Sequence, residues 1–174
     1  MMVQLKPHGI QHIGLTVPDM EQAVRFFEDF FGAETCLSTG PLLVDDAYMI
    51  RKLGVPGNTR IKDIRVLRCA NGSNLELFEY SGEAGPKLIK RNSEVGGWHF
   101  AFEVDDASVA AEQLRSNGVE VLEGPNYVDS GPLDGLTWVY FRAPWGQFLE
   151  LVSIKGSLAY EKNGGPKLWS PASN

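Results

Sequence analysis

The segment HIGLTVPD at residues 12–19 opens a pattern that the chain repeats from HFAFEVDD at residues 99–106. Each segment is followed by a helical pattern, and each half ends in a strand built around Leu-Glu-Leu: NLELFEY at 74–80 and FLELVS at 148–153. A repeat of this kind is typical of a duplicated supersecondary unit. The sequence therefore predicts two modules of one fold, residues 9–80 and 97–153, in a single domain with a C-terminal tail at 156–174.

The first module contains the signals for one helix among four strands. Residues 9–17 are apolar and β-branched and predict a strand that Pro18 ends. Asp19 is placed to cap a helix that Gly32 ends. The apolar residues that recur at helical spacing are Met20, Ala23, Val24, Phe27 and Phe31. Three strands are predicted after this helix, at residues 34–43, 62–70 and 74–80.

The second module repeats this plan with different side chains. A strand is predicted at 97–104, a helix capped by Asp105 or Asp106, and a helix end at Asn117-Gly118. The helical spacing is carried by Val109, Ala110, Gln113 and Leu114, and three strands follow at 119–128, 136–143 and 147–153. Each module therefore reads as βαβββ, which makes the fold class α+β.

Two segments have no counterpart in the repeat. Residues 44–61 extend the first module between its second and third strands and can include a helical turn. Long loops of this kind are often lids or binding loops. The tail at 156–174 is rich in Gly and Pro yet carries Tyr160, Leu168 and Trp169, so it is either a packed arm or a disordered end.

The composition excludes several classes of protein. With 43% hydrophobic and 22% charged residues, the chain is typical of a soluble globular protein. Its net charge of −6 disfavours a nucleic-acid partner, and no apolar run is long enough to span a membrane. Residues 1–11 lack the apolar centre of a signal peptide, and Cys36 and Cys69 have no disulfide-like spacing. We therefore expect a cytoplasmic protein.

Each module begins with a histidine and has a glutamate at the centre of its Leu-Glu-Leu strand. The histidines are His12 and His99, and the glutamates are Glu76 and Glu150. Each glutamate alternates with two leucines, so if the leucines pack on the helices, both carboxylates lie on the other face. A pseudo-twofold axis can bring the four side chains together, and two imidazoles with two carboxylates suit a divalent cation. The alternative is that each is an ordinary strand residue, exposed or hydrogen-bonded.

On these residues the chain resembles the vicinal oxygen chelate superfamily, which includes glyoxalase I, methylmalonyl-CoA epimerase, extradiol dioxygenases and fosfomycin- and bleomycin-resistance proteins. The resemblance covers about residues 9–153 and is most specific over 12–34, 99–121 and the strands ending in LEL. It implies paired βαβββ modules that form an open, cupped mixed sheet with helices on its outer face. By motif position it implies four metal ligands: His12, Glu76, His99 and Glu150.

The ligand set helps to choose among the reactions of the family. Extradiol dioxygenases use two His and one carboxylate, and Glu76 fills the position that they leave open. The full set resembles bacterial glyoxalase I and the epimerases, in which a metal chelates two neighbouring substrate oxygens and a ligand carboxylate moves the adjacent proton. The resemblance therefore implies Glu150 as the catalytic base, with Glu76 as its pseudo-symmetric rival.

The glutathione anchors of glyoxalase I do not carry over. The family pattern has an arginine four residues after the first histidine, where this chain has Thr16. An asparagine soon after the first glutamate ligand is matched by Tyr80, and the DPDG-like turn has become residues 143–146. The two missing anchors point away from glyoxalase I itself, whereas the changed turn concerns only the hairpin.

Substrate contacts are expected from one basic segment and from several aromatic residues. Residues 51–68 hold six basic side chains against one acidic, which predicts an anion-binding rim or, alternatively, a solvated surface. The aromatic residues that either line the pocket or belong to the core are Phe78, Tyr80, Trp98 and Tyr140. The proposed substrate-binding residues are Tyr80, Arg65, Arg51, Phe78 and Trp98.

We therefore expect a metal-dependent isomerase, epimerase or lyase that moves a proton next to a metal-chelated carbonyl of a small, anionic substrate. The alternatives are an Fe(II)-dependent extradiol-type dioxygenase and a resistance protein that sequesters a drug or metabolite. The ligand set admits Ni, Co, Mn, Zn or Fe(II). The family further implies a homodimer, in some members with the site shared between subunits, and the sequence names neither substrate nor metal.

Overall fold

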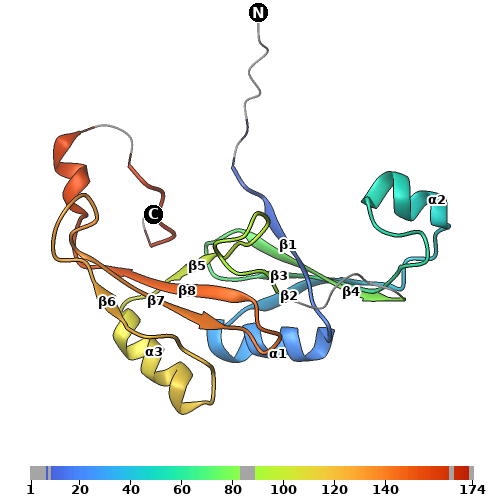
Figure 1. The fold of residues 1–174 in the computed structure, drawn as a ribbon, viewed down its shortest axis with the longest axis horizontal. Coiled ribbons are helices and arrows are strands. Elements are labelled where there is room, and N and C mark those ends of the chain that lie inside the picture. Colours follow the sequence, from blue (N-terminus) through green and yellow to red (C-terminus); the bar gives the residue numbers. More distant parts are fainter. Residues whose placement is uncertain (1–6, 8, 83–88, 165–166, 173–174) are drawn as a thin grey trace, which may run out of the picture. The chain divides into compact units, whose positions relative to one another are not determined.

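The structure, a computed structural model, describes residues 7, 9–82, 89–164 and 167–172. The chain forms two compact units, Met1–Lys87 and Leu88–Asn174. Figure 1 shows that each unit combines strands with a helix packed along a sheet, as the α+β prediction requires. Among the described residues, no helix has the length and apolar character needed to cross a membrane.

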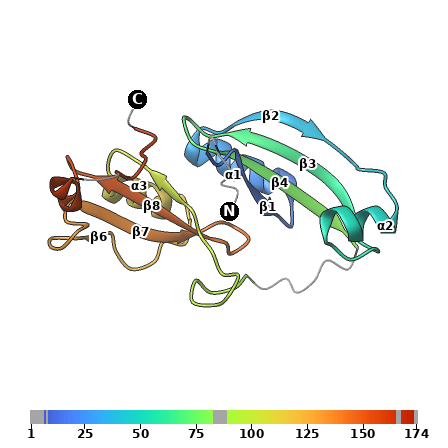
Figure 2. The same cartoon turned by 90° about the horizontal axis from the view of Figure 1, so that it is seen from above.

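The first unit is a four-stranded mixed sheet with one long helix. The strands lie in the order β1-β4-β3-β2, with β1 parallel to β4 and the other pairs antiparallel. Figure 2 shows these strands side by side. The elements are β1 (His12–Thr16), α1 (Met20–Phe31), β2 (Glu34–Thr39), β3 (Arg60–Arg68) and β4 (Asn74–Ser81).

The second unit repeats this topology. Its sheet has the order β5-β8-β7-β6, again with the first and last strands of the module parallel. The elements are β5 (Ala101–Glu103), α3 (Ala107–Ser116), β6 (Asn126–Tyr127), β7 (Leu136–Arg142), β8 (Phe148–Ile154) and the 3-10 helix η2 (Ala159–Asn163).

The registers of the two sheets correspond to each other. In each module the central glutamate pairs with the residue two places after the opening histidine: Gly14 with Glu76, and Ala101 with Glu150. A one-residue slip would turn every side chain of a strand to the other face. The shared register therefore gives each glutamate the same orientation within its own sheet.

The two long helices begin at the predicted aspartates. The Asp19 carboxylate accepts a hydrogen bond from the Gln22 backbone N–H at 2.9 Å, and Gly32 ends α1 at a left-handed φ of 59°. In α3 the cap is Asp106, whose carboxylate accepts bonds from the backbone N–H groups of Ser108 and Val109. Side-chain caps satisfy N–H groups that the helix itself cannot pair.

The leucines of the Leu-Glu-Leu strands form the core beneath the helices. Leu75, Leu77, Leu149 and Leu151 are each at most 2% exposed, so the glutamates between them face the opposite side of each sheet. Helix α3 differs from the prediction at Val109, which is 56% exposed. The buried positions of α3 are Ala107, Ala111 and Leu114, and those of α1 are Met20, Ala23, Val24, Phe26 and Phe27.

Several predicted strands are shorter than the sequence suggested: the strand predicted at 9–17 spans His12–Thr16, and the one predicted at 34–43 spans Glu34–Thr39. The strand predicted at 97–104 is regular only over Ala101–Glu103. The strand predicted at 119–128 is reduced to Asn126–Tyr127 and an isolated bridge between Val121 and Phe141. Gly124-Pro125 interrupts this second segment, and a proline has no N–H to donate to a sheet.

The insertion and the tail both contain ordered structure. Residues 44–61 include a helical turn, α2 (Asp46–Tyr48), which runs directly into a π-helical turn, η1 (Met49–Leu53), and Met49 is fully buried. These turns lie beyond one end of the first sheet (Figures 1 and 2). In the tail, Leu158 is 2% exposed and begins a packed segment.

Candidate functional site

The first His–Glu pair lies on two neighbouring strands of the first sheet. His12 begins β1 and Glu76 lies in β4, and the His12 Nε2 atom is 3.4 Å from the Glu76 Oε2 atom. The His12 Nδ1 atom lies 2.6 Å from the Gln11 side-chain oxygen. If Nδ1 donates to that oxygen, Nε2 keeps its lone pair, which is the form of imidazole that binds a metal.

The second pair repeats this geometry. The His99 Nε2 atom is 3.4 Å from the Glu150 Oε2 atom, the same separation as in the first pair. The Glu150 side chain is only 15% exposed. Burial raises the pKa of its carboxyl, and the neighbouring His99 partly offsets that rise. A carboxylate that is desolvated in this way favours a positive partner or a proton.

A tyrosine distinguishes the second pair from the first. Tyr140 lies directly across from Glu150, and its hydroxyl oxygen is 3.4 Å from the His99 Nε2 atom. Its ring packs edge-on against the imidazole at a centroid distance of 4.9 Å. The residue across from Glu76 is Val66, which has no polar group. The two modules therefore share their His–Glu geometry but differ in polarity beside it.

Within each unit, the types of donor atom suit a divalent cation. Each unit offers one imidazole nitrogen and one carboxylate oxygen on the same sheet face, both of which are types that Mn, Co, Ni, Zn and Fe(II) accept. Within the described part of the chain, no group of three or more His, Cys, Asp or Glu side chains gathers as a metal site. The expectation that both pairs serve one cation stays a prediction.

Two of the expected substrate contacts share the face of Glu76. Phe78 and Tyr80 alternate with the buried leucines of β4, and their rings stack at a centroid distance of 5.9 Å. Burial, and then the negative charge of Glu76, raise the pKa of the Tyr80 hydroxyl. These two aromatic residues remain candidates for a substrate-binding wall.

Arg65 lies on the other face of the first sheet. It is the register partner of Leu77, which is fully buried on the helix side. Its guanidinium forms ion pairs with Glu21 of α1 and, at 3.0 Å, with Asp63. Arg65 therefore does not share the face of Glu76, and we leave it out of the site.

Trp98 is also turned away from its module's glutamate. Its ring stacks on Phe100 at 6.0 Å, and Phe100 in turn packs on Phe102 at 5.3 Å. Phe102 is the register partner of the buried Leu151, on the face opposite Glu150. This ladder of aromatic rings places Trp98 with the core side of the second sheet.

Three of the six basic side chains at residues 51–68 are paired with carboxylates. Arg51 lies in η1, and its Nε donates to the Ala47 carbonyl at 3.4 Å. The remaining contacts of the segment are ion pairs of Arg60 with Asp46 at 2.5 Å, of Lys62 with Glu79 and of Arg65 with Glu21 and Asp63, and a bond from Arg68 to the Ala70 carbonyl. The charges of Arg60, Lys62 and Arg65 are therefore offset by carboxylates, and an anion-binding role for the rest of the segment stays a prediction.

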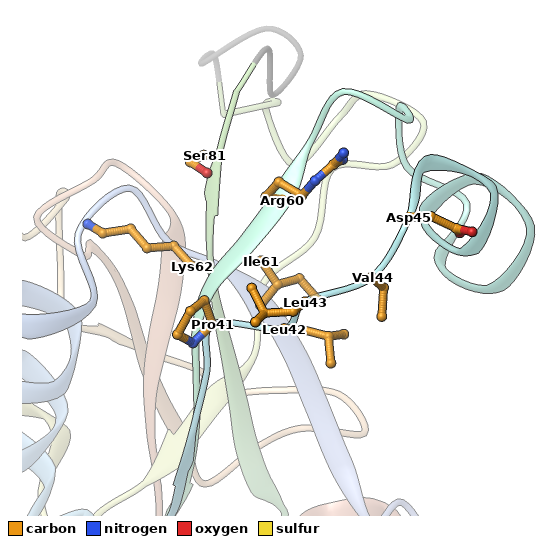
Figure 3. Close-up of a pocket in the computed structure, with 9 residues that line it drawn as sticks. All are labelled: Pro41, Leu42, Leu43, Val44, Asp45, Arg60, Ile61, Lys62 and Ser81. Atoms are coloured by element: carbon orange, nitrogen blue, oxygen red, sulfur yellow. The ribbon is translucent and has the colours of Figure 1, made fainter.

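A cavity of about 540 Å³ lies in the first unit, away from the His–Glu pair. Figure 3 shows Pro41, Leu42 and Ile61 gathered in it, with the side chains of Arg60 and Lys62 pointing away from this group. It reaches Ser81 at the end of β4, whereas Glu76 lies near the start of that strand. At about 3.3 Å per residue, the two points are separated by roughly 17 Å along the strand.

Comparison with known proteins agrees with these elements. The model of the glyoxalase/bleomycin resistance protein/dioxygenase superfamily matches residues 9–151. A 2-epi-5-epi-valiolone epimerase from an Actinomyces species is 40% identical over 167 residues, which cover 94% of this chain and 88% of that protein.

Solved structures share the fold at lower identity. A glyoxalase family protein from Bacillus cereus has a TM-score of 0.70 at 18% identity, covering 90% of this chain and 100% of that one. A fosfomycin resistance protein from Listeria monocytogenes has a TM-score of 0.58 at 18% identity, covering 87% and 97%. On its family match and its relative at 40% identity, the chain belongs to the glyoxalase/bleomycin resistance protein/dioxygenase superfamily.

Proposed function

We propose that this protein is a metal-dependent epimerase that inverts a carbon next to the carbonyl of a polyhydroxylated cyclic ketone. The observation that carries the proposal is the repeated His–Glu pair, with the same 3.4 Å separation in both modules. The 40% identity to a 2-epi-5-epi-valiolone epimerase supports the reaction and the class of substrate. The ending of that substrate's name denotes a ketone.

His12, Glu76, His99 and Glu150 are the residues that would hold the cation. When bound, a divalent cation supplies a Lewis acid that draws in two neighbouring substrate oxygens and polarises the carbonyl. The imidazoles act as neutral ligands, and the carboxylates offset the charge of the cation. This assignment is the same as the one that the sequence predicts.

The proton transfer falls to the carboxylates. Glu150 takes the proton from the carbon next to the carbonyl, and the electron pair of the broken C–H bond moves towards the carbonyl oxygen. Inversion requires a proton to return to the opposite face of that carbon, and Glu76 is the second carboxyl group available for this step. The greater burial of Glu150 supports its role as the base, because a desolvated carboxylate binds a proton more strongly.

Tyr140 orients the substrate in this proposal. Its hydroxyl lies 3.4 Å from the His99 Nε2 atom and across from Glu150, close to both groups of the second pair. From there the hydroxyl donates a hydrogen bond to a substrate oxygen on which negative charge develops. Val66, at the equivalent place in the first module, has no donor.

The proposal takes a neutral substrate in place of the anion expected from the sequence, and the ion pairs of half of the basic side chains at 51–68 support this choice. The cations of residues 60, 62 and 65 are already engaged by carboxylates. A polyhydroxylated ketone needs no cation beyond the metal, and it presents hydroxyl groups to polar side chains such as Tyr140. We therefore propose a neutral α-hydroxyketone as the substrate class.

The test combines metal content with the fate of one proton. Protein purified without chelators is analysed for metals and then incubated with 2-epi-5-epi-valiolone in deuterated water, with NMR following deuterium entry next to the carbonyl. We expect bound divalent metal, deuterium incorporation and a second epimer. Glu150→Gln should reduce turnover at least about 100-fold, and the exposed Glu112→Gln on α3 serves as the matched control.

Two results would contradict the proposal. Full turnover by Glu150→Gln and Glu76→Gln would remove the carboxylates from the mechanism. Protein that binds no divalent metal even after reconstitution, and exchanges no deuterium, would exclude the epimerase. Oxygen uptake with a catechol in the same preparation would instead favour the dioxygenase alternative.

The family also supports a homodimer, as the sequence resemblance implies. Light scattering coupled to size-exclusion chromatography would return about twice the chain mass of 19.2 kDa if this is correct. A monomer that retains full activity would show that the partner subunit supplies no residue to the site.

A further inference from the structure

The chain beyond the second sheet is attached to it at several points. Leu158 is 2% exposed, and η2 follows directly. The backbone N–H of Ala159 donates to the Asp134 carbonyl at 3.3 Å, and that of Tyr160 donates to the Pro132 carbonyl at 3.0 Å. This segment is therefore a fixed part of the second unit.

Residues 167–172, which we call the C-terminal strap, are held at both ends. Near its start, the Leu168 backbone N–H donates to the Tyr160 hydroxyl at 2.7 Å, and Lys167 forms an ion pair with Glu161 at 2.9 Å. Further on, the Ser170 hydroxyl donates to the Glu103 carboxylate at 2.8 Å. The second anchor joins the strap to β5.

This anchor lies on the sheet face that carries Glu150. Glu103 is the register partner of Val152, two residues beyond Glu150, and residues two apart on a strand share a face. Leu149 and Leu151 occupy the other face, beside α3. Figure 1 shows α3 on one side of this sheet and the C-terminal strap on the other.

Two large side chains of the strap, Leu168 and Trp169, are left uncovered. Trp169 is 69% exposed, although the residues on both sides of it are anchored. The preceding Leu168 is similarly exposed, at 67%. The indole is thus attached one residue from a fixed point on the Glu150 face, and an exposed aromatic ring is stabilised when it covers another apolar surface.

We propose that Trp169 of the C-terminal strap is a wall of the substrate site and packs over the ring of the bound ketone. The C–H face of a polyhydroxylated ring is apolar and matches the flat face of an indole. The Ser170–Glu103 bond positions the strap, and Trp169 makes the contact. The inference rests on the proposed function, because it requires a ligand beside Glu150.

The experiment compares two neighbouring residues of equal exposure. Wild type, Trp169→Ala and Leu168→Ala are assayed with Mn²⁺ and 2-epi-5-epi-valiolone for kcat and KM. Trp169→Ala should raise KM about fivefold to tenfold with kcat changed less than about twofold, because a ring contact made equally before and during the reaction contributes to binding alone. Leu168→Ala should behave as wild type. Ser170→Ala, which frees the strap, should raise KM in the same direction.

A second readout does not depend on turnover. Hydrogen–deuterium exchange of peptides covering 167–172 should slow when the ketone is added to the Mn²⁺-loaded wild type, and should slow less in Trp169→Ala. Wild type that is active, with Trp169→Ala matching it in KM and in exchange, would overturn this inference alone. Wild type that binds none of Ni, Co, Mn, Zn and Fe(II) and does not turn over the ketone with any of them would overturn the proposed function, and the inference with it.

Discussion

Glu79 and Ser153 occupy the same position in the two modules, and each accepts a hydrogen bond from the first backbone N–H of its module's long helix. The Glu79 Oε2 atom accepts from Met20 at 3.1 Å, and the Ser153 hydroxyl accepts from Ala107 at 3.1 Å. Both residues lie three places after the central glutamate of a Leu-Glu-Leu strand. The strand that carries the proposed metal ligand thus also fixes where the helix begins.

Loss of the second of these bonds should be measurable. Ser153 is 9% exposed, so Ser153→Ala leaves the Ala107 N–H without its acceptor in a poorly hydrated place. We expect the free energy of unfolding to fall by about 1 kcal/mol, as for the loss of a helix cap. Urea unfolding monitored by circular dichroism measures this. The exposed Ser157→Ala is the control, and equal stability of the two variants would contradict the assignment.

Removal of the Tyr140 hydroxyl should affect turnover without affecting metal binding. Tyr140→Phe keeps the edge-on ring contact with His99 but removes the donor beside Glu150. We expect kcat to fall about 10-fold to 100-fold with the metal content unchanged. Steady-state kinetics and elemental analysis test this, with the exposed Tyr127→Phe as the control. A variant that loses its metal instead would make Tyr140 a support of the ligand set.

Chelation should abolish activity, and divalent metals should restore it. After dialysis against EDTA, we expect turnover to return on addition of at least one of Ni, Co, Mn, Zn or Fe(II). His12→Ala and His99→Ala should each weaken metal binding, because each removes the imidazole from one pair. Titration calorimetry with the apoprotein measures the affinities. Unchanged affinity in His12→Ala would restrict the site to the second module.

The ion pair between Glu21 and Arg65 gives a prediction about acid stability. The hydrogen bond from Arg65 and its positive charge lower the pKa of the Glu21 carboxyl below the ordinary 4.5. This pair therefore stabilises the fold fully above the ordinary value, and the contribution is lost as the pH falls through the lower folded-state value. In Glu21→Gln the loss of stability between about pH 5 and pH 3 should be slightly smaller than in wild type, since the pair is exposed.

Urea unfolding at several pH values tests that difference. Glu28→Gln, an exposed change on the same helix, is the control. If the stability of Glu21→Gln falls with acid as steeply as that of wild type, the ion pair between Glu21 and Arg65 does not stabilise the folded protein in solution.

The sequence predicted the elements whose signals are local. Asp19 and Gly32 mark the ends of α1 as expected, and the leucines around Glu76 and Glu150 are buried as the alternation required. The opening histidines lie beside these glutamates in their own modules. For these elements the hydrophobic pattern of the sequence agrees with the packing, so the sequence alone was sufficient to predict them.

The misplaced residues depend on information that a list of basic or aromatic side chains does not contain. Arg65 is two residues from Leu67, which is fully buried, so alternation along β3 already puts Arg65 on the helix side. A count of charges over residues 51–68 contains neither the face on which each side chain lies nor the acidic partners distant in the sequence, such as Glu21. The hydrogen bonds of Glu79 and Ser153 joined residues too far apart in the sequence for a local motif to reveal.

The parallel pairing of β1 with β4 has a consequence for how each module assembles. β1 is made first, but its partner follows only after the helix and two further strands, whereas β3 and β4 meet through a tight turn. Closing a long loop costs more entropy than closing a short one, so the hairpin strands gather before β1 docks. We therefore expect the histidine that opens each module to be positioned late in folding, after the glutamate of β4 or β8.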